Sequence, residues 1–353
     1  MKHAKLLSLS LIAIGLGVSS CSNDNDPSES AGRAIRFTVV APPTPRNVPK
    51  VETTTTTINN FLLNAYTGNN LFIDNLKVTG SNADGWQYSP EYYWPAKPVN
   101  FYAVSPTVSG LTAPPTGNDT FKASYTNKGD VDLLYSVAAD QHPGNTQTPQ
   151  PVSLNFRHAL SRVVVNMLSS NPQISVKVYD VSFENVCESG VFEFPRETTA
   201  ADSKESGTWS EQGGMTTSTV YSNADGSAYL TSAPVLFSNC DYNFALPQTL
   251  RDVDATATTV TGSYIKVKCV IDDATDTHNR LWPNSTTPAA NVDGEYGVIR
   301  FPLVTEKADS WKQGQGYIYN LDINKVPGLN LIEFTVTVDI INIYTGADIS
   351  SPL

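Results

Sequence analysis

The sequence lacks the short motifs of common catalytic and metal-binding sites. It contains no GxSxG, HExxH, GxGxxG or P-loop pattern, and no two of its four histidines lie at a ligand-like spacing. His158 is interpreted as a hydrogen-bonded structural residue. Asp272, Asp273, Asp276 and His278 are interpreted as a solvated turn, with a calcium site as the weaker alternative. We therefore expect no catalytic residue, no bound metal and no cofactor.

Cysteine is also scarce. The four cysteines are Cys21, Cys187, Cys240 and Cys269, and no two of them form a CxxC pair. If Cys21 is modified, the other three can form at most one disulfide, which excludes a disulfide framework as the basis of the fold. Cys269 alternates with apolar neighbours and is expected to be a small core residue.

Basic residues are outnumbered by acidic ones. The chain has 23 lysines and arginines against 34 acids, a net charge of −11, and no basic stripe reverses this locally. This balance excludes a nucleic-acid partner and opposes binding to anionic lipid headgroups. Charged residues make up 16% and hydrophobic residues 40%, which is enough apolar material for folded cores. The length of 353 residues favours two domains.

The N-terminus predicts secretion and lipid attachment. Met1–Lys5 is basic, and the apolar stretch Leu6–Val18 is too short to cross a bilayer as a helix, which needs about 20 residues. The following Ser19-Ser20-Cys21 resembles the lipobox of bacterial lipoproteins, in which the cysteine becomes the acylated first residue. We predict a signal peptide over 1–20 and a lipid on Cys21 that attaches the protein to the outer membrane.

A polar tether follows the lipidated cysteine over residues 21–33. Asp24, Asp26 and Glu29 lie close behind Cys21. Acidic residues at this place resemble the surface-export signal of Bacteroidetes lipoproteins. We therefore expect the mature protein to be exposed on the cell surface.

Short runs of alternating apolar residues dominate the rest of the chain, and no segment shows a long helical period. This pattern predicts an all-β fold of two tandem β-sandwich domains over 34–150 and 151–353, with the polar stretch 197–223 as a loop. The predicted strands cover residues 34–40, 61–66, 71–78, 99–103, 132–137, 152–158, 160–167, 174–186, 191–194, 228–237, 264–271, 297–303, 317–323 and 331–343.

An aromatic cluster precedes the predicted strand 99–103. The stretch Trp86–Pro95 contains Tyr93, Trp94 and other aromatic residues. Aromatic clusters in β-sandwiches most often fill the core, and this is the favoured interpretation. The alternative is an exposed platform, made of Trp86, Tyr93 and Trp94, on which a glycan or a host protein binds.

Several segments, taken in their order along the chain, resemble one family: the fimbrillins of Bacteroidetes, the subunits of type V pili and their relatives. The matching segments are the lipobox at Cys21, Trp86 with Tyr92-Tyr93-Trp94-Pro95, Phe101-Tyr102-Ala103, Asp132-Leu133-Leu134, Phe156 to Val163, and Gly316 to Leu321.

The resemblance implies two transthyretin-like β-sandwiches and a lipidated precursor that reaches the cell surface. In pilus-forming members a trypsin-like protease cuts after an arginine near the first strand, and a strand from a neighbouring subunit fills the groove that is left. Arg46 fits this role best, because it lies in a proline-rich connector directly after the strand Ala34–Val40. Arg33 and Arg36 are the alternatives.

A missing strand exposes unpaired backbone groups and an apolar groove, which a donor strand can fill. The expected donor is the C-terminal strand 331–343. Many relatives carry a tryptophan just after this strand, whereas this chain continues to Leu353 without one. The extension is expected either to act as the donor of a stalk subunit or to close its own sheet, as in a tip or anchor subunit. The alternating side chains of the expected donor are those of Ile332, Phe334, Val336, Val338 and Ile340.

The resemblance thus implies a structural pilus subunit with a role in adhesion, whose partners are other pilus subunits. The alternative function is a non-polymerising surface lipoprotein that binds a glycan or a host protein. Neither function is enzymatic.

Overall fold

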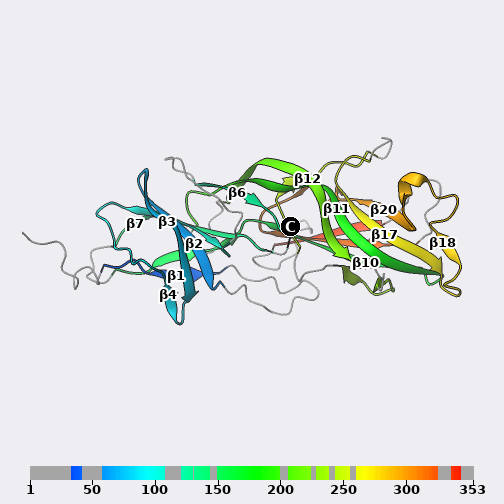
Figure 1. The fold of residues 1–353 in the computed structure, drawn as a ribbon, viewed down its shortest axis with the longest axis horizontal. Helices are drawn as coiled ribbons and strands as arrows, with labels where there is room; N and C mark the ends of the chain where they lie inside the picture. Colours follow the sequence, from blue (N-terminus) through cyan, green and yellow to red (C-terminus); the bar gives the residue numbers. More distant parts are fainter. Residues whose placement is uncertain are drawn as a thin grey trace, which may run out of the picture.

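The all-β prediction is confirmed by the computed structural model (Figure 1). The only helix among the described residues is the single 3₁₀ turn η1 (Ala289–Asn291), and none of them forms a helix able to cross a membrane. The structure describes residues 33–41, 58–107, 121–129, 131–143, 149–198, 206–223, 228–237, 243–254 and 260–324, and the backbone of 335–342.

The N-terminal half is built on an antiparallel sheet with the order β4-β3-β2-β5-β7-β9 in the described residues. Both faces of this sheet are covered. Phe101 and Ala103 of β5 pack into one core, and Tyr102 and Val104, which alternate with them, pack into another. The strands are β2 (Asn60–Thr67), β3 (Asn70–Ser81), β4 (Gly85–Gln87), β5 (Val99–Ser105), β7 (Leu134–Gln141) and β9 (Arg157–His158).

One face of this sheet is covered by the parallel pair β1 (Phe37–Val40) and β8 (Val152–Asn155). The inward side chains of both strands belong to the same core as Phe101, which we call the N-terminal core. Val152, Leu154 and Phe156 lie in this core, so in packing terms the N-terminal half extends past the boundary expected at residue 150.

The C-terminal half is a sandwich of two sheets around a second core that includes Val163, Val181, Val267 and Tyr319. In the described residues the larger sheet has the order β12-β11-β17-β20-β19, with β6, β13 and β18 joined to it, and the smaller has the order β14-β10-β22-β23, with β15 joined to it.

The strands of the larger sheet are β6 (Lys122–Thr126), β11 (Ile174–Glu193), β12 (Thr208–Ser222), β13 (Ala228–Tyr229), β17 (Tyr264–Asp273), β18 (Arg280–Trp282), β19 (Val292–Asp293) and β20 (Tyr296–Pro302). The others are β10 (Ser161–Leu168), β14 (Val235–Phe237), β15 (Phe244–Ala245), β22 (Gln315–Asp322) and β23 (Thr335–Asn342), with the short pair β16 (Gln248–Thr249) and β21 (Ser310–Trp311).

The prediction of a loop over 197–223 is wrong, because β12 runs from Thr208 to Ser222 and pairs with β11 along most of its length. Of the residues in β12, only Val220 is buried, so the strand has almost no apolar alternation for a sequence pattern to detect. Its threonines and serines suit an exposed strand, in which backbone pairing matters more than burial.

The two halves follow one another along the long axis of the molecule (Figure 1). A third buried cluster joins them. Tyr66 and Tyr102 from the N-terminal sheet pack with Phe121, Phe192 and Phe194. Strand β6, which precedes β7 in the chain, pairs with β11 of the C-terminal sheet. The contact between the halves is therefore apolar and strand-paired.

Candidate functional site

The first strand is attached to the rest of the protein mainly along one edge. Within the described residues β1 pairs with β8 alone, in parallel, from Phe37 opposite Val152 to Val40 opposite Asn155. Two further backbone hydrogen bonds flank this ladder: the carbonyl of Arg36 accepts from Val152 at 2.7 Å, and that of Val40 accepts from Phe156 at 2.8 Å. Such a strand can be separated without breaking a second ladder.

The other edge of β1 is satisfied largely by side chains. The amide side chain of Asn82 accepts a hydrogen bond from the N–H of Val39 at 2.9 Å and donates one to its carbonyl at 2.6 Å. The Tyr88 hydroxyl donates to the carbonyl of Ile35. Only the start of the segment meets backbone here, where the N–H of Ile35 donates to the carbonyl of Tyr92 at 2.9 Å.

A tight turn holds Asn82 in this position. Gly80, just before it, has φ of 135°, and a Cβ there would lie 2.3 Å from the carbonyl oxygen of Gly85. The Ser81 hydroxyl donates to Asp84 at 2.8 Å and closes the turn. The indole of Trp86 then donates to Asn82 Oδ1 at 2.9 Å, which fixes the orientation of the amide.

The inward side chains of the segment complete the N-terminal core. Ile35 is fully buried, and Phe37 and Val39 are each 7% exposed. The ring of Phe37 lies 6.1 Å from that of Phe61, 5.7 Å from Tyr88 and 5.8 Å from Phe101, measured between centroids. Removal of β1 would leave an apolar groove lined by these rings, which we call the β1 groove.

The outward side chains of the segment are polar or exposed. The Arg36 guanidinium donates to the Glu91 carboxylate at 2.9 Å, with both side chains about half exposed. Hydrogen bonds from Arg36 and then from Tyr93 lower the pKa of Glu91. A cavity of about 300 Å³ lies beside this ion pair, lined by Phe37, Trp86 and their neighbours. The edge of β1 that faces away from β8 therefore borders an open pocket.

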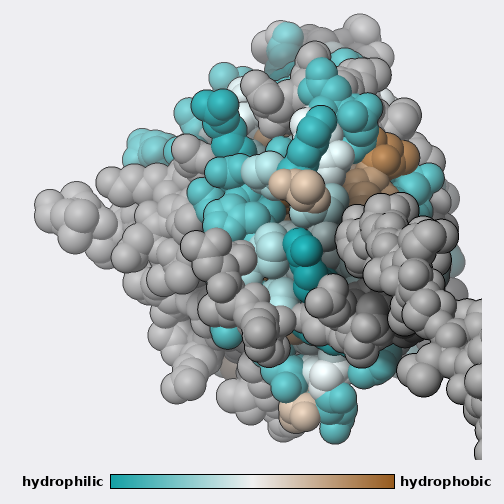
Figure 2. All heavy atoms as spheres, turned by 90° about the vertical axis from the view of Figure 1, so that its left-hand side faces the viewer, coloured by the Kyte–Doolittle hydropathy of each residue, from teal (hydrophilic) through white to brown (hydrophobic). Residues whose placement is uncertain are grey.

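The exposed aromatic platform is contradicted by the burial of two of its three residues. Trp86 and Trp94 are each only 6% exposed, because their rings pack in the N-terminal core against Phe61 and Phe101. Tyr93 alone is accessible, at 38%. Among the described residues on the face in Figure 2, hydrophilic colour prevails and brown is confined to a small area. The cluster fills the core, as the favoured interpretation predicted.

Several predicted site residues lie outside the described residues: Cys21, Arg46, Ile332 and Phe334, together with the side chains of Val336, Val338 and Ile340. The backbone of β23 is described, and it is the last strand of its sheet there, antiparallel to β22. Arg33 is exposed and lies before β1, where its carbonyl accepts from the N–H of Trp94 at 3.1 Å.

His158 has a set of contacts typical of a structural residue. It is 3% exposed, and its Nδ1 lies 2.7 Å from Oδ2 of Asp132. Its carbonyl accepts from Nε2 of Gln313 at 2.9 Å, which links the two halves.

The acidic turn is held by internal contacts. Asp272 pairs with Arg280 at 2.5 Å, and Asp273 accepts from the backbone and hydroxyl of Thr275. No group of three potential metal ligands occurs in the described part of the chain.

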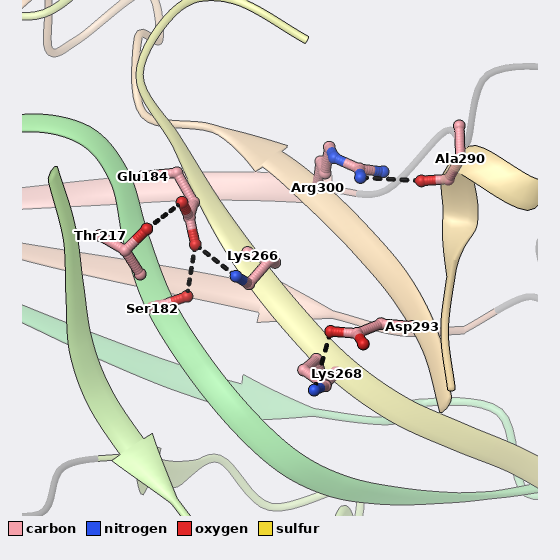
Figure 3. Close-up of polar contacts among 8 residues, drawn as sticks. All are labelled: Ser182, Glu184, Thr217, Lys266, Lys268, Ala290, Asp293 and Arg300. Atoms are coloured by element: carbon pink, nitrogen blue, oxygen red, sulfur yellow. Dashed lines mark hydrogen bonds and ion pairs between the residues drawn. The ribbon is translucent and has the colours of Figure 1, made fainter. Parts of the chain in front are cut away.

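Two ion pairs, Glu184–Lys266 and Lys268–Asp293, lie on the outer face of the larger C-terminal sheet (Figure 3). Glu184 accepts from Lys266 at 2.6 Å and also from Ser182 and Thr217. Burial alone would raise the pKa of Glu184, but these three hydrogen bonds outweigh it and lower the pKa. Glu184 and Lys266 are thus matched inside the protein, as are Lys268 and Asp293, so we interpret this face as structural.

Replacing Lys266 by methionine is expected to lower the free energy of unfolding by about 1–3 kcal/mol, because it leaves the Glu184 carboxylate buried without its cation. The lowered pKa of Glu184 means that the pair stabilises the fold above pH about 4.3 and loses this effect in more acidic solution. Urea unfolding at pH 7 and pH 3 measures both effects.

Lys268→Met is the matched control, since its partner Asp293 is 56% exposed, and an exposed pair contributes less than about 1 kcal/mol. The two lysine variants could lose equal free energy of unfolding, or the loss in Lys266→Met could persist unchanged at pH 3. Either result would contradict the interpretation that Lys266 stabilises the fold through the Glu184 carboxylate.

Three residues of the β1 groove were missed at the sequence level: Asn82, Tyr88 and Glu91. Asn82 lies 43 positions from Val39 and Glu91 lies 55 from Arg36. No local pattern connects them. The groove itself had one signal in the sequence: Ile35-Arg36-Phe37-Thr38-Val39 is nearly repeated as Ile332-Glu333-Phe334-Thr335-Val336.

Comparison with known proteins matches residues 49–339 to the model of the fimbrillin-like family. A crystal structure of a fimbrial protein from Bacteroides vulgatus shares the fold, with a TM-score of 0.52 and 18% sequence identity over 88% of this chain and 99% of that one. A fimbrilin from Porphyromonas gingivalis W83 has a TM-score of 0.44 and 10% identity, over 88% and 97% of the two chains. A search of the curated proteins found no match.

Proposed function

The chain belongs to the fimbrillin-like family, and we propose that it is a structural subunit of a cell-surface pilus with a role in adhesion. The subunit polymerises by donor-strand exchange, in which a protease releases β1 and a strand of another subunit takes its place. The observation that carries this proposal is the attachment of β1: its inward side chains complete the N-terminal core, while its backbone pairs with β8 alone in the described residues.

Arg46 is the arginine at which a cut would free the strand. A cut after Arg33 leaves all of β1 joined to the chain, because this residue precedes the strand. A cut after Arg36 likewise leaves Phe37–Val40 joined to the chain. A cut after Arg46 separates the whole segment 34–40 from the residues that follow.

The energetics favour replacement over an empty groove. The three inward side chains of the segment contribute roughly 1.5–3 kcal/mol each through burial, and its backbone hydrogen bonds add roughly 1 kcal/mol each. A subunit that lost β1 would lose this stabilisation and expose an apolar surface. A donor strand with matching side chains restores it, less an association cost of at least about 4 kcal/mol.

The donor is the C-terminal segment that includes β23. This strand lies at the edge of its sheet in the described residues, so it can leave by breaking its pairing with β22 alone. Its counterpart in the pilus is a second subunit whose β1 has been removed.

The precursor is held at the outer membrane by a lipid on Cys21 and joins the pilus after processing. The lipobox and the acidic residues behind it support this location. In this role the chain is a structural subunit that needs no cofactor and catalyses no reaction.

Mature protein with Cys21→Ser, treated with a limiting amount of an arginine-specific protease, is expected to form filaments, whereas Arg46→Ala is expected to remain monomeric, because β1 then stays covalently attached. Size-exclusion chromatography and negative-stain microscopy measure the outcome, and N-terminal sequencing locates the cut.

Arg33→Ala and Arg36→Ala are the matched controls and are expected to polymerise like the parent protein. Monomeric products after a verified cut at Arg46 would refute strand exchange.

A further inference from the structure

The strand in the β1 groove and the C-terminal segment are nearly the same peptide. Between Ile35–Val39 and Ile332–Val336, four of five residues are identical and in the same order. The one difference is at the second position, where Arg36 corresponds to Glu333. The identical residues include Ile35, Phe37 and Val39, whose side chains fill the N-terminal core.

The aromatic pocket of the groove selects one alignment of the two peptides. The ring of Phe37 is surrounded by three aromatic rings at 5.7–6.1 Å. Residues 331–343 contain a single phenylalanine, Phe334. A shift by two residues would put Ile332 or Val336 in this pocket, and the loss of ring contacts would leave a void. Phe334 therefore fixes the register.

The backbone contacts are compatible with this alignment and do not themselves select it. In it, Val336 takes the place of Val39, whose N–H and carbonyl are both bound by Asn82. These contacts involve main-chain groups, so they accept any residue that brings its backbone to the same place.

Building on the proposed function, we propose that Ile332–Val336 of a second copy replaces Ile35–Val39 residue for residue and in the same direction, parallel to β8. Phe334 then occupies the Phe37 pocket, and Glu333 lies beside Glu91. The recognition site for the partner is the groove between β8 and Asn82, with Glu91 at its rim.

This register reverses one charge at the rim. Arg36 attracts Glu91 across 2.9 Å in the uncut subunit, whereas Glu333 repels it. Both side chains of the present pair are about half exposed, so each interaction has a modest effect that salt weakens further. Glu91 therefore stabilises β1 in the groove and destabilises the bound donor strand. It thereby affects how readily the donor replaces β1.

A charge-reversal cycle in the mature full chain tests the register. Glu333→Lys is expected to speed filament growth roughly two- to fivefold at low salt when Glu91 is present, and to slow it by a similar factor in the Glu91→Lys background. Lysine is used because an added arginine would be a new site for the arginine-specific protease. The opposite sign of the effect in the two backgrounds is the evidence for the contact. The release of β1 cannot produce it, because within each background the two proteins compared have the same β1 and the same residue 91. Light scattering after cleavage at Arg46 gives the rates.

Asp339→Lys is the matched control, because it makes the same charge change in the donor at a position that does not meet Glu91 in this register. Its effect is expected to be equal in the two backgrounds. Filaments whose growth responds identically to Glu333→Lys in both backgrounds would overturn the register and leave strand exchange standing. Absence of filaments from every cleaved variant would overturn strand exchange itself.

Discussion

Replacing Phe37 by alanine is expected to lower the free energy of unfolding by about 3–5 kcal/mol. The side chain is 7% exposed, and its ring meets those of Phe61, Tyr88 and Phe101. Alanine leaves a cavity that this rigid aromatic wall cannot easily fill. Urea unfolding followed by tryptophan fluorescence reports the loss, since Trp86 lies in the same core.

Val40→Ala is the matched control for this measurement. Val40 belongs to the same strand but is 50% exposed, so its truncation is expected to change stability by less than about 0.5 kcal/mol. If the Phe37 variant were as stable as the Val40 variant, β1 would contribute little to the core, and its removal would not create a groove that needs filling.

Replacing Phe334 by alanine is expected to reduce the affinity of cleaved subunits for one another at least a hundredfold. In the proposed register its ring fills the Phe37 pocket, and the loss of a buried phenyl ring costs about 3–5 kcal/mol, whereas about 1.4 kcal/mol corresponds to a factor of ten. Sedimentation of cleaved protein over a range of concentrations gives the critical concentration for assembly.

Thr335→Ala is expected to assemble nearly as well as the parent, because this position corresponds to the partly exposed Thr38. Phe334→Leu should be intermediate, since leucine restores volume without the ring contacts. A critical concentration unchanged by Phe334→Ala would mean that another segment fills the groove.

The fold class was accessible from sequence because the inward residues of most strands alternate with outward ones. In β17, Ile265, Val267, Cys269 and Ile271 are buried in the C-terminal core, as period-two alternation predicts. The alternation of buried and exposed residues does not show which strands pair with one another, however. The pairing of β6 with β11, and of β1 with β8, depends on contacts between residues far apart in the chain.

Strand β12 shows where alternation fails. It is held mainly by its ladder to β11, and backbone hydrogen bonds do not require apolar side chains at alternate positions. For Trp86 and Trp94 the favoured prediction of a core was right, but an exposed platform stayed open as the alternative because aromatic composition does not distinguish a surface from a core.

The candidate site was predictable in part. Ile35, Phe37 and Val39 were recognisable as one face of a strand, and the donor has the same pattern. The rim of the groove was not, because Asn82 and Glu91 are ordinary polar residues that acquire a role only when folding brings them to Val39 and Arg36. The near-repeat of the two peptides is visible in the sequence, but its meaning depends on knowing that the first copy fills a core.

Mass spectrometry of washed filaments tests the replacement of β1 most directly, by measuring the molar ratio of peptides from residues 34–46 to peptides from β11. Replacement of the strand predicts that the first set is absent, or far below one copy per subunit. Recovery of one copy per subunit in intact filaments would show that β1 stays in place during assembly, and it would contradict the proposed exchange.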